Sequence, residues 1–244
     1  MSHLPVLYRD EHFIAVNKPA DLLVHRTYID RERDVALQRV RDQIGQRVYP
    51  LHRLDRATSG VLVFGLSPEA AGALAEQVRG REIRKDYLAV VRGWPQTEGL
   101  IERPLKNRGS GEMQDARTAY RRLETVQLPI PVARWPTARY ALVGVSIETG
   151  RRHQIRRHLA GINHPVVGDT THGDGRHNRI FREHFRSRRL LLHAERLQFR
   201  QPFTGETVEI TAPLPEDFAA VLDDLGWGLR SPHGTACVGE AGQS

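Results

Sequence analysis

The chain is organised by short apolar segments rich in β-branched residues, each bounded by glycine, proline or a polar turn. Segments of about four to eight residues with this composition are typical of strands, whereas helices need longer runs with a 3.6-residue period. We therefore predict strands over 6–8, 13–16, 60–64, 87–91, 140–147, 190–192, 197–199 and 207–210.

Helical periodicity is confined to fewer segments. Apolar residues recur at helical spacing over 34–44 and 215–225. Ser67 is a favourable cap for a helix that ends at Gly80, because its hydroxyl satisfies a free backbone amide. Since strands dominate and do not alternate regularly with helices, we predict an α+β fold with a central mixed, mainly antiparallel sheet and flanking helices.

The expected organisation is one domain over residues 1–229. Residues 230–244 lack apolar periodicity and are expected to form a disordered tail. Two polar or proline-rich segments, 104–118 and 127–138, have the composition of insertions.

Basic residues outnumber acidic ones, 36 to 29, and the formal charge is +7. The positive charge is mostly arginine, since Lys18, Lys85 and Lys106 are the only lysines. Codon bias in a GC-rich genome would explain an arginine excess equally well. The arginines are concentrated, however, in 151–157 and 176–189, and clustered cations favour nucleic acid because they release its counterions.

Several classes of function are disfavoured by what the sequence lacks. No apolar run approaches the roughly 20 residues of a membrane span, and the first residues do not resemble a secretory signal, so we expect a cytoplasmic protein with no membrane partner. Cys237 is the only cysteine. Phosphate-binding glycine motifs are missing, and no cofactor is expected.

One histidine-rich region is a candidate for a metal site. Its spacings match no standard zinc ligand set, and the surrounding arginines would repel a cation. The residues concerned are His172, Asp174, His177, His184 and His193. No metal is expected.

Asp55 is the first candidate for chemistry. It lies between Arg53 and Arg56 in a loop that ends at Gly60, where neighbouring cations would keep a carboxylate ionised as a nucleophile or base. A surface ion pair is the plain alternative, and from these residues alone it is favoured. A kinase catalytic loop is excluded, because Leu54 separates the arginine from the aspartate.

A second candidate is the segment Gly150–His158, which follows a predicted strand and opens a helix. Helix N-termini bind anions through their free amides, although a solvated basic face fits the same pattern. Tyr87 could stack on an unpaired base, but a lone tyrosine in a strand more often packs in a core.

Taken in order, these segments resemble the RluA-type pseudouridine synthases, from about residue 4 to residue 228. Six motifs in the same order make the resemblance specific. They are Asn17–Pro19 with Leu22–His25, His52–Asp55 with Thr58–Gly60, Lys85–Val90, Thr149–Arg156, His164–Asp169 and Leu192–Ala194.

The resemblance implies a pseudouridine synthase fold with a catalytic cleft and assigns roles to its residues. Asp55 becomes the nucleophile, Tyr87 packs on the target base, Arg151 pairs with the nucleophile, and Leu192 forms an apolar wall. Arg53 fills the gap left by the flipped nucleotide. Further RNA contacts are expected from Lys18, His52, Arg56, Lys85, Arg156, Arg186, Arg188 and Arg189.

The resemblance narrows to the branch of that family that modifies uridine 65 of tRNA. Residues 136–140, 172–174 and 226–227 are similar to that branch. Asp21 stands where many members have glycine, and we expect the domain to lack an S4-like RNA-binding extension. We expect a monomer that binds tRNA and needs no obligate protein partner. A synthase of ribosomal or several RNAs, or a non-catalytic RNA-binding protein, stays open as an alternative.

Overall fold

The computed structural model describes residues 3–25 and 34–228. The predicted tail and Cys237 lie outside the described residues. The strands are β1 Val6–Arg9, β2 Phe13–Lys18, β3 Tyr49–Pro50, β4 Ser59–Gly65, β5 Arg84–Arg92, β6 Glu98–Glu102, β7 Leu105–Lys106, β8 Met113–Gln114, β9 Arg117–Leu128, β10 Ala138–Ile147, β11 Leu192–Arg200 and β12 Thr207–Thr211. The helices are α1 Ala36–Ile44, α2 Pro68–Gly80, α3 Gln154–Gly161, α4 Gly175–His184 and α5 Glu216–Asp224.

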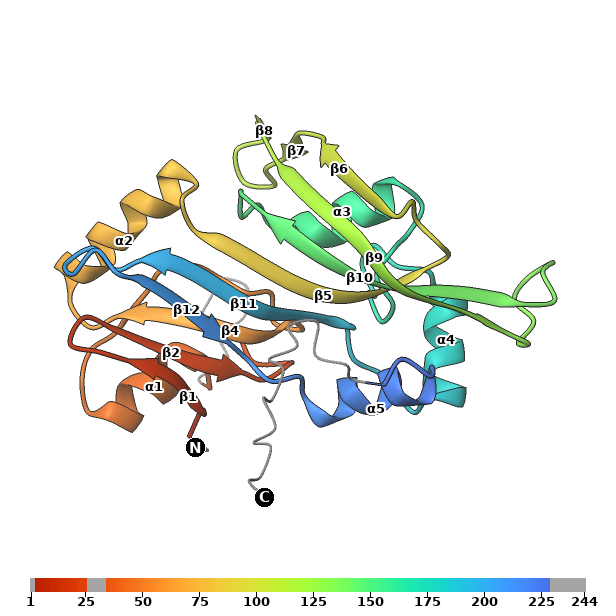
Figure 1. Cartoon of the computed structure of the whole chain (residues 1–244), viewed down its shortest axis with the longest axis horizontal. Helices are drawn as coiled ribbons and strands as arrows, with labels where there is room; N and C mark the ends of the chain where they lie inside the picture. The colour runs from red at the N-terminus through yellow and green to blue at the C-terminus, as the bar shows by residue number, and fades with distance from the viewer. Residues whose placement is uncertain (1–2, 26–33, 229–244) are drawn as a thin grey trace, which may run out of the picture.

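One large sheet forms the centre of the molecule, with the strand order β1-β2-β4-β11-β5-β10-β9-β6 (Figure 1). β12 pairs with β11, and β3 pairs with β4. Among these pairs only β4 and β11 run parallel. The predicted α+β class and the mixed, mainly antiparallel sheet are therefore confirmed.

Helices cover both faces of this sheet, because successive residues of a strand point to opposite sides. On β5, Ala89 packs in the cluster that includes α1 and α3, whereas Val90 packs with α4 and α5. On β4, Val61 and Val63 pack with α2. Leu54, in the loop before β4, and Ile155, in α3, pack in the same cluster as Ala89, so both segments lie on one face of the sheet.

The parallel contact between β4 and β11 explains why a glycine follows the Asp55 loop. Gly60 has φ 118°, and a Cβ at this position would lie 2.0 Å from the carbonyl oxygen of Ala194. Any other residue would push the two strands apart just after the loop. The spacing between Asp55 and β11 therefore depends on Gly60.

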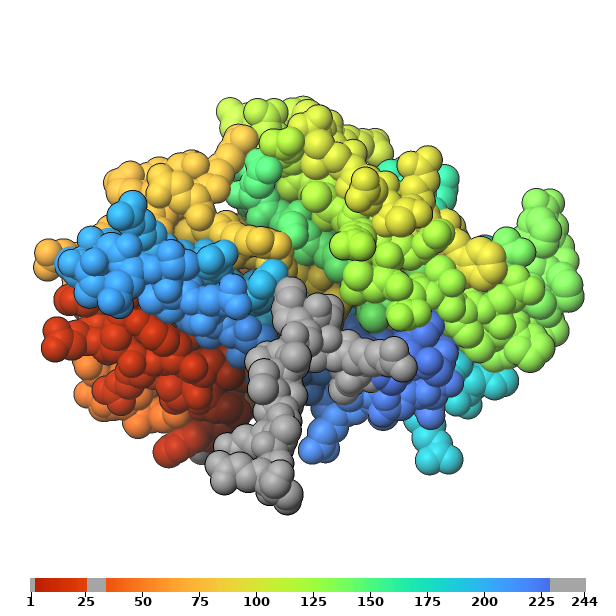
Figure 2. Space-filling view, viewed as in Figure 1, coloured from red at the N-terminus to blue at the C-terminus, as the bar shows by residue number. Residues whose placement is uncertain are grey.

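The predicted hairpin at the start of the chain, the four predicted helices and most predicted strands are confirmed. Six elements were missed: β3, β6, β7, β8, β9 and α4. β9 is largely polar and half-exposed, so its sequence lacks an apolar pattern, and its pairing with β10 along ten positions defines it. The tip of the β9–β10 hairpin projects from one end of the molecule (Figure 2).

Candidate active site

Asp55 lies in the loop between β3 and β4. The Thr58 N–H donates to the Asp55 carbonyl at 3.0 Å, which closes a tight turn, and buried Leu54 anchors the turn to the core. The side chain of Asp55 is 17 % exposed. Its carboxylate therefore faces a cleft and not the open surface, contrary to the alternative of a surface ion pair.

Lys18 stabilises this loop through hydrogen bonds from its buried side chain. Its side chain is fully buried, and its ammonium donates to the carbonyls of Pro19, Leu22 and Arg56 at 2.8, 2.8 and 3.1 Å. An ammonium that is saturated by carbonyls and removed from solvent does not reach a phosphate. The prediction that Lys18 contacts RNA is corrected to a structural role.

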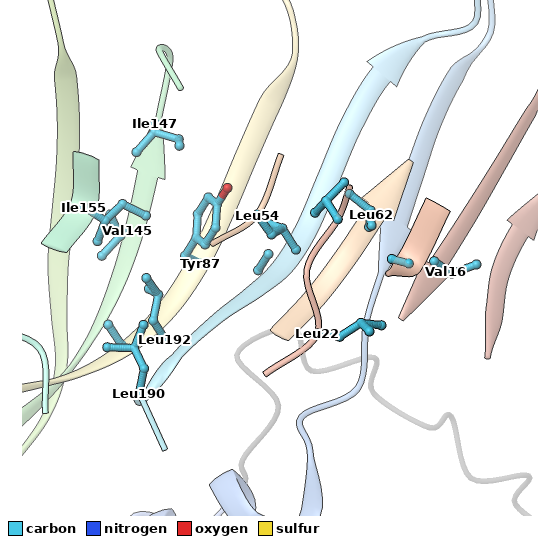
Figure 3. Close-up of a cluster of buried hydrophobic side chains, with 14 of the residues drawn as sticks. Val16, Leu22, Leu54, Leu62, Tyr87, Val145, Ile147, Ile155, Leu190 and Leu192 are labelled. Carbon is cyan, nitrogen blue, oxygen red and sulfur yellow. The ribbon is translucent and has the colours of Figure 1, made fainter. Parts of the chain in front are cut away.

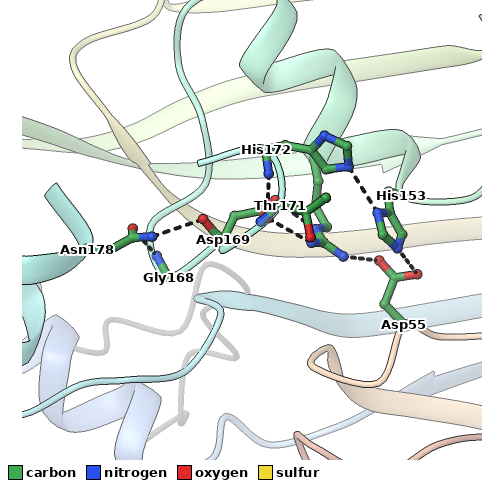
Figure 4. A network of polar contacts seen from close by, with 8 residues as sticks. Asp55, His153, Gly168, Asp169, Thr171, His172 and Asn178 are labelled. Carbon is green, nitrogen blue, oxygen red and sulfur yellow. Dashed lines mark hydrogen bonds and ion pairs between the residues drawn. The ribbon is translucent and has the colours of Figure 1, made fainter. Parts of the chain in front are cut away.

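Arg156, in the first turn of α3, makes the ion pair with Asp55. Its Nη1 lies 3.0 Å from Asp55 Oδ2, while Nε and Nη2 both donate to Asp169 at 2.7 Å (Figure 4). The bidentate contact fixes the plane of the guanidinium and aims its remaining nitrogen at Asp55.

The prediction that Arg151 pairs with the nucleophile is therefore wrong, because Arg156 makes that ion pair. Arg156 was predicted to contact RNA; in the structure each of its guanidinium nitrogens contacts a carboxylate of the protein. Arg151 precedes α3, and its Nε donates to the Asp115 carbonyl at 3.0 Å. It lines the same cleft without the ion pair. Sequence reasoning also missed Asp169, although the motif His164–Asp169 ends on it.

Gln154 fixes the start of α3 and hence the position of Arg156. Its Oε1 accepts from the Thr149 hydroxyl at 2.7 Å and from the Arg151 N–H at 3.1 Å. Its Nε2 donates to the Arg117 carbonyl and to Thr118 Oγ1. This buried amide joins α3 to β9 and to the end of β10.

The cleft in front of Asp55 has a volume of about 440 Å³. Its lining includes Arg53, Tyr87, Arg151, His153 and Leu192. Tyr87 lies between Leu54 and Val145 (Figure 3). Burial, together with Asp55 and Asp86, raises the pKa of Tyr87, so its phenol is neutral at pH 7. The structure thus brings the predicted nucleophile, tyrosine and leucine together.

His153 lies on the other side of the Asp55 carboxylate. Its Nε2 is 3.9 Å from Asp55 Oδ1, and its Nδ1 is 3.0 Å from Nε2 of His172. Burial is the main cause that lowers the pKa of His153 to about 4 and also lowers the pKa of His172. Neither histidine was assigned a role from the sequence, although both lie in the segments that carry the resemblance.

The other predicted RNA contacts differ in their exposure. Arg53 is exposed at the mouth of the cleft, and Arg56 is exposed beside it, where its Nε donates to the Asp21 carbonyl. Lys85 lines the cleft but is buried. His52 also lines the cleft, and its Nε2 accepts from the Val63 N–H at 3.3 Å, while burial and Lys85 lower its pKa to about 3.

Of the three arginines after α4, Arg186 and Arg188 are exposed and Arg189 is buried. Arg189 donates to Ser59 Oγ and to Asp217, both at 2.6 Å. These contacts hold the start of β4 against α5, so the expected RNA contact at Arg189 is corrected to a structural one.

Two negative findings apply to residues 3–25 and 34–228. No helix there is long and apolar enough to cross a membrane. No cluster of His, Cys, Asp and Glu there has the arrangement of a metal site. Two histidines of the candidate ligand set contact different residues: His177 contacts Tyr140, and His193 contacts Ser59.

Solved structures define the class of fold. Human RNA Pseudouridylate Synthase Domain Containing 4 superposes with a TM-score of 0.70 at 25% identity, covering 91% of this chain and 93% of the human one. Human RNA Pseudouridylate Synthase Domain Containing 1 gives 0.67 at 28% identity, covering 87% and 84%. The fold described above is therefore that of pseudouridylate synthases.

The chain belongs to the RNA pseudouridylate synthase family, whose pattern it matches over residues 12–161. Its relatives include the tRNA pseudouridine synthase C of Vibrio cholerae, 48% identical over 92% of this chain and 96% of the relative. The Salmonella typhi protein of the same name is 49% identical over 92% and 90%. The Yersinia pestis protein is 44% identical over 94% of each chain. The protein is thus a pseudouridine synthase, an isomerase.

Proposed function

We propose that this enzyme converts uridine 65 of tRNA to pseudouridine, with Asp55 as the nucleophile. The substrate class is supported by the name shared by the Vibrio, Salmonella and Yersinia relatives. The position is supported by the resemblance of residues 136–140, 172–174 and 226–227 to the branch that modifies uridine 65.

One observation carries the assignment of Asp55: its carboxylate is held by Arg156 inside a cleft walled by Tyr87 and Leu192. The reaction breaks the bond between ribose C1′ and N1 of uracil and forms a bond between C1′ and C5. C5 loses a proton and N1 gains one, so the atoms balance without a cofactor. An oxygen of Asp55 attacks either the sugar carbon or the base, and the cleft retains the uracil while it turns.

The walls of the cleft supply the confinement that this reaction needs. Tyr87 offers an aromatic ring to the uracil, a type of contact that contributes about 1–3 kcal/mol per base. Leu192, 3% exposed on β11, closes the cleft as an apolar side chain. Extruding a base from a stem costs a few kcal/mol, and exposed Arg53 is placed to offset part of that cost by filling the gap.

The nucleophile is tested with a tRNA transcript that carries tritium at C5 of its uridines. The native enzyme releases tritium to water. We expect Asp55→Asn to release it at least about a thousandfold more slowly, because an amide cannot form the covalent bond, while the variant still binds tRNA. Asp42→Asn, at an exposed position of α1, is the matched control and should react normally. Tritium release by Asp55→Asn at a rate within about a hundredfold of native would refute the assignment.

The substrate is tested by mapping pseudouridine in cellular RNA with and without the gene. Loss of the modification at position 65 of tRNA supports the proposal. Loss from ribosomal RNA instead would assign the enzyme to the alternative substrate, and no loss together with intact RNA binding would favour a non-catalytic protein.

The proposal extends to how the protein works in the cell. The catalytic domain over residues 1–229 acts as a monomer in the cytoplasm and needs no protein partner. Sedimentation of the purified protein with tRNA tests this, since a complex of two chains per tRNA would contradict it.

A further inference from the structure

Two histidines connect Asp55 to the loop that holds Arg156. His153 contacts the carboxylate oxygen that Arg156 leaves open: its Nε2 lies 3.9 Å from Oδ1, whereas Arg156 binds Oδ2. Its other ring nitrogen, Nδ1, is 3.0 Å from Nε2 of His172 (Figure 4). The reaction described above uses neither imidazole.

The distance between the two rings requires one nitrogen to donate and the other to accept. Because burial lowers the pKa of both histidines, each ring is neutral at pH 7 and carries a single N–H. If His153 donated through Nδ1, its Nε2 would direct a lone pair at the carboxylate of Asp55. If His172 donates through Nε2, the N–H of His153 lies on Nε2 and faces that carboxylate. Electrostatics favour the second arrangement.

We propose that His153 is a positioning residue for Asp55 and that His172 sets its tautomer by donating from Nε2 to His153 Nδ1. The separation of 3.9 Å is longer than a hydrogen bond. Catalytic hydrogen bonds are often long without substrate and shorten when it binds. In the complex, His153 and Arg156 hold one oxygen each, so the carboxylate cannot rotate away from its target. This inference rests on Asp55 as the nucleophile.

The backbone supports a dedicated role for His153. It caps α3 with φ 53° and ψ 30°, a left-handed conformation that is unusual for a residue other than glycine. The imidazole of His153 lines the cleft. Such outliers cluster at functional sites, because the surrounding structure must hold them in place.

His172 is held by the same acid that orients Arg156. Its backbone N–H donates to Asp169 Oδ1 at 2.9 Å, next to the bidentate contact from Arg156. A Cβ on the next residue, Gly173, would lie 2.1 Å from the Asp169 carbonyl oxygen, so the chain is closely packed here. Asp169 therefore positions Arg156 directly and His153 through His172.

The tautomer is tested by nitrogen NMR of the ring of His153 in the full-length protein. We expect Nε2 to carry the proton and Nδ1 to be unprotonated, and His172→Leu to remove this preference. A proton on Nδ1 of His153 would overturn the proposal. This measurement does not depend on turnover. A wrong tautomer would therefore refute the proposed contact between His172 and His153, whereas the Asp55→Asn variant separately tests Asp55 as the nucleophile.

Kinetics test the positioning role. We expect His153→Leu and His172→Leu to lower kcat by about 10²-fold with little change in KM, because a misplaced nucleophile affects chemistry more than binding. His153→Gln and His172→Gln keep an N–H near the position of Nε2 and should recover most of kcat. His177→Leu, which removes a histidine bonded to Tyr140 away from Asp55, is the matched control and should leave kcat unchanged.

Three outcomes would contradict the proposal. They are a native kcat in both leucine variants, a loss confined to KM, and equal losses in the leucine and glutamine variants. Chemical denaturation of every variant accompanies the kinetics. The glutamine variants keep the test decisive even if a leucine variant is destabilised.

Discussion

Arg156 and Arg189 are two buried arginines with different functions, although the sequence suggested RNA binding for both. Each makes contacts through all three of its guanidinium nitrogens. Arg156 binds a fully buried carboxylate, Asp169, and aims its third nitrogen at Asp55 in the cleft. Arg189 binds Ser59 and the exposed carboxylate of Asp217.

The difference shows that burial of an arginine does not identify its role. The role is indicated by the group that accepts from the guanidinium nitrogen not bound to the partner carboxylate. At Arg156 that group lies in a cavity of about 440 Å³ with an aromatic and an aliphatic wall. At Arg189 it is Ser59, at the point where β4 begins and pairs in parallel with β11.

The largest expected effect is from Arg156→Leu. It should reduce turnover by roughly a thousandfold or more, because Asp55 loses its orienting cation. It should also lower the free energy of unfolding by about 3–5 kcal/mol, since Asp169 is left buried without its partner. Tritium release and urea unfolding measure the two effects. Unchanged turnover in a folded Arg156→Leu protein would refute a catalytic role for Arg156.

Arg189→Leu should lower stability but leave turnover nearly unchanged. We expect a loss of about 1–3 kcal/mol in the free energy of unfolding, because Ser59 loses a buried donor, and a kcat within about twofold of native. The same two measurements apply. If kcat fell as far as in Arg156→Leu, the two arginines would belong to one catalytic unit.

The region around Arg189 should also make stability depend on pH through His193. Burial and Arg189 lower the pKa of this histidine to about 4, from an ordinary value near 6.5. Between these values the unfolded chain binds a proton that the folded chain does not, so stability is fully present above pH 6.5 and falls as the pH drops toward 4. The loss is on the order of 2–3 kcal/mol.

Urea unfolding at several pH values checks this dependence, with His193→Gln as the comparison. In the native fold His193 accepts from the Ser59 hydroxyl and donates to the Ala212 carbonyl. The variant should show a shallower decline between pH 6.5 and 4. An identical decline would mean that other groups, such as His52, cause it.

The smallest effect is expected from the exposed neighbours of Arg189. Replacing Arg186 and Arg188 by glutamine should weaken tRNA binding and lower the slope of log affinity against log salt by up to about 2. The double replacement of exposed Arg41 and Arg47, on and just after α1, is the matched control. Equal slopes for the two double variants would place 186–188 off the RNA path.

Much of the fold could be predicted because its signals are local. The caps of α2 and the short β-branched segments of β4 and β5 are visible in consecutive residues. β9 and α4 were missed because most of their residues are polar and face solvent. β9 is positioned by its pairing with β10, and α4 by packing in the cluster that contains Val90 and α5, and neither contact is visible in a local pattern.

By itself, the sequence determined the class of fold, the family and the position of Asp55 in a motif of fixed order. Only the tertiary structure decided which arginine reaches that aspartate, since Asp55 and Arg156 are 101 residues apart. It also placed Lys18 and Arg189 in the interior and paired His153 with His172. The physical reason is that periodicity and caps express local backbone chemistry, whereas an ion pair depends on where distant elements pack.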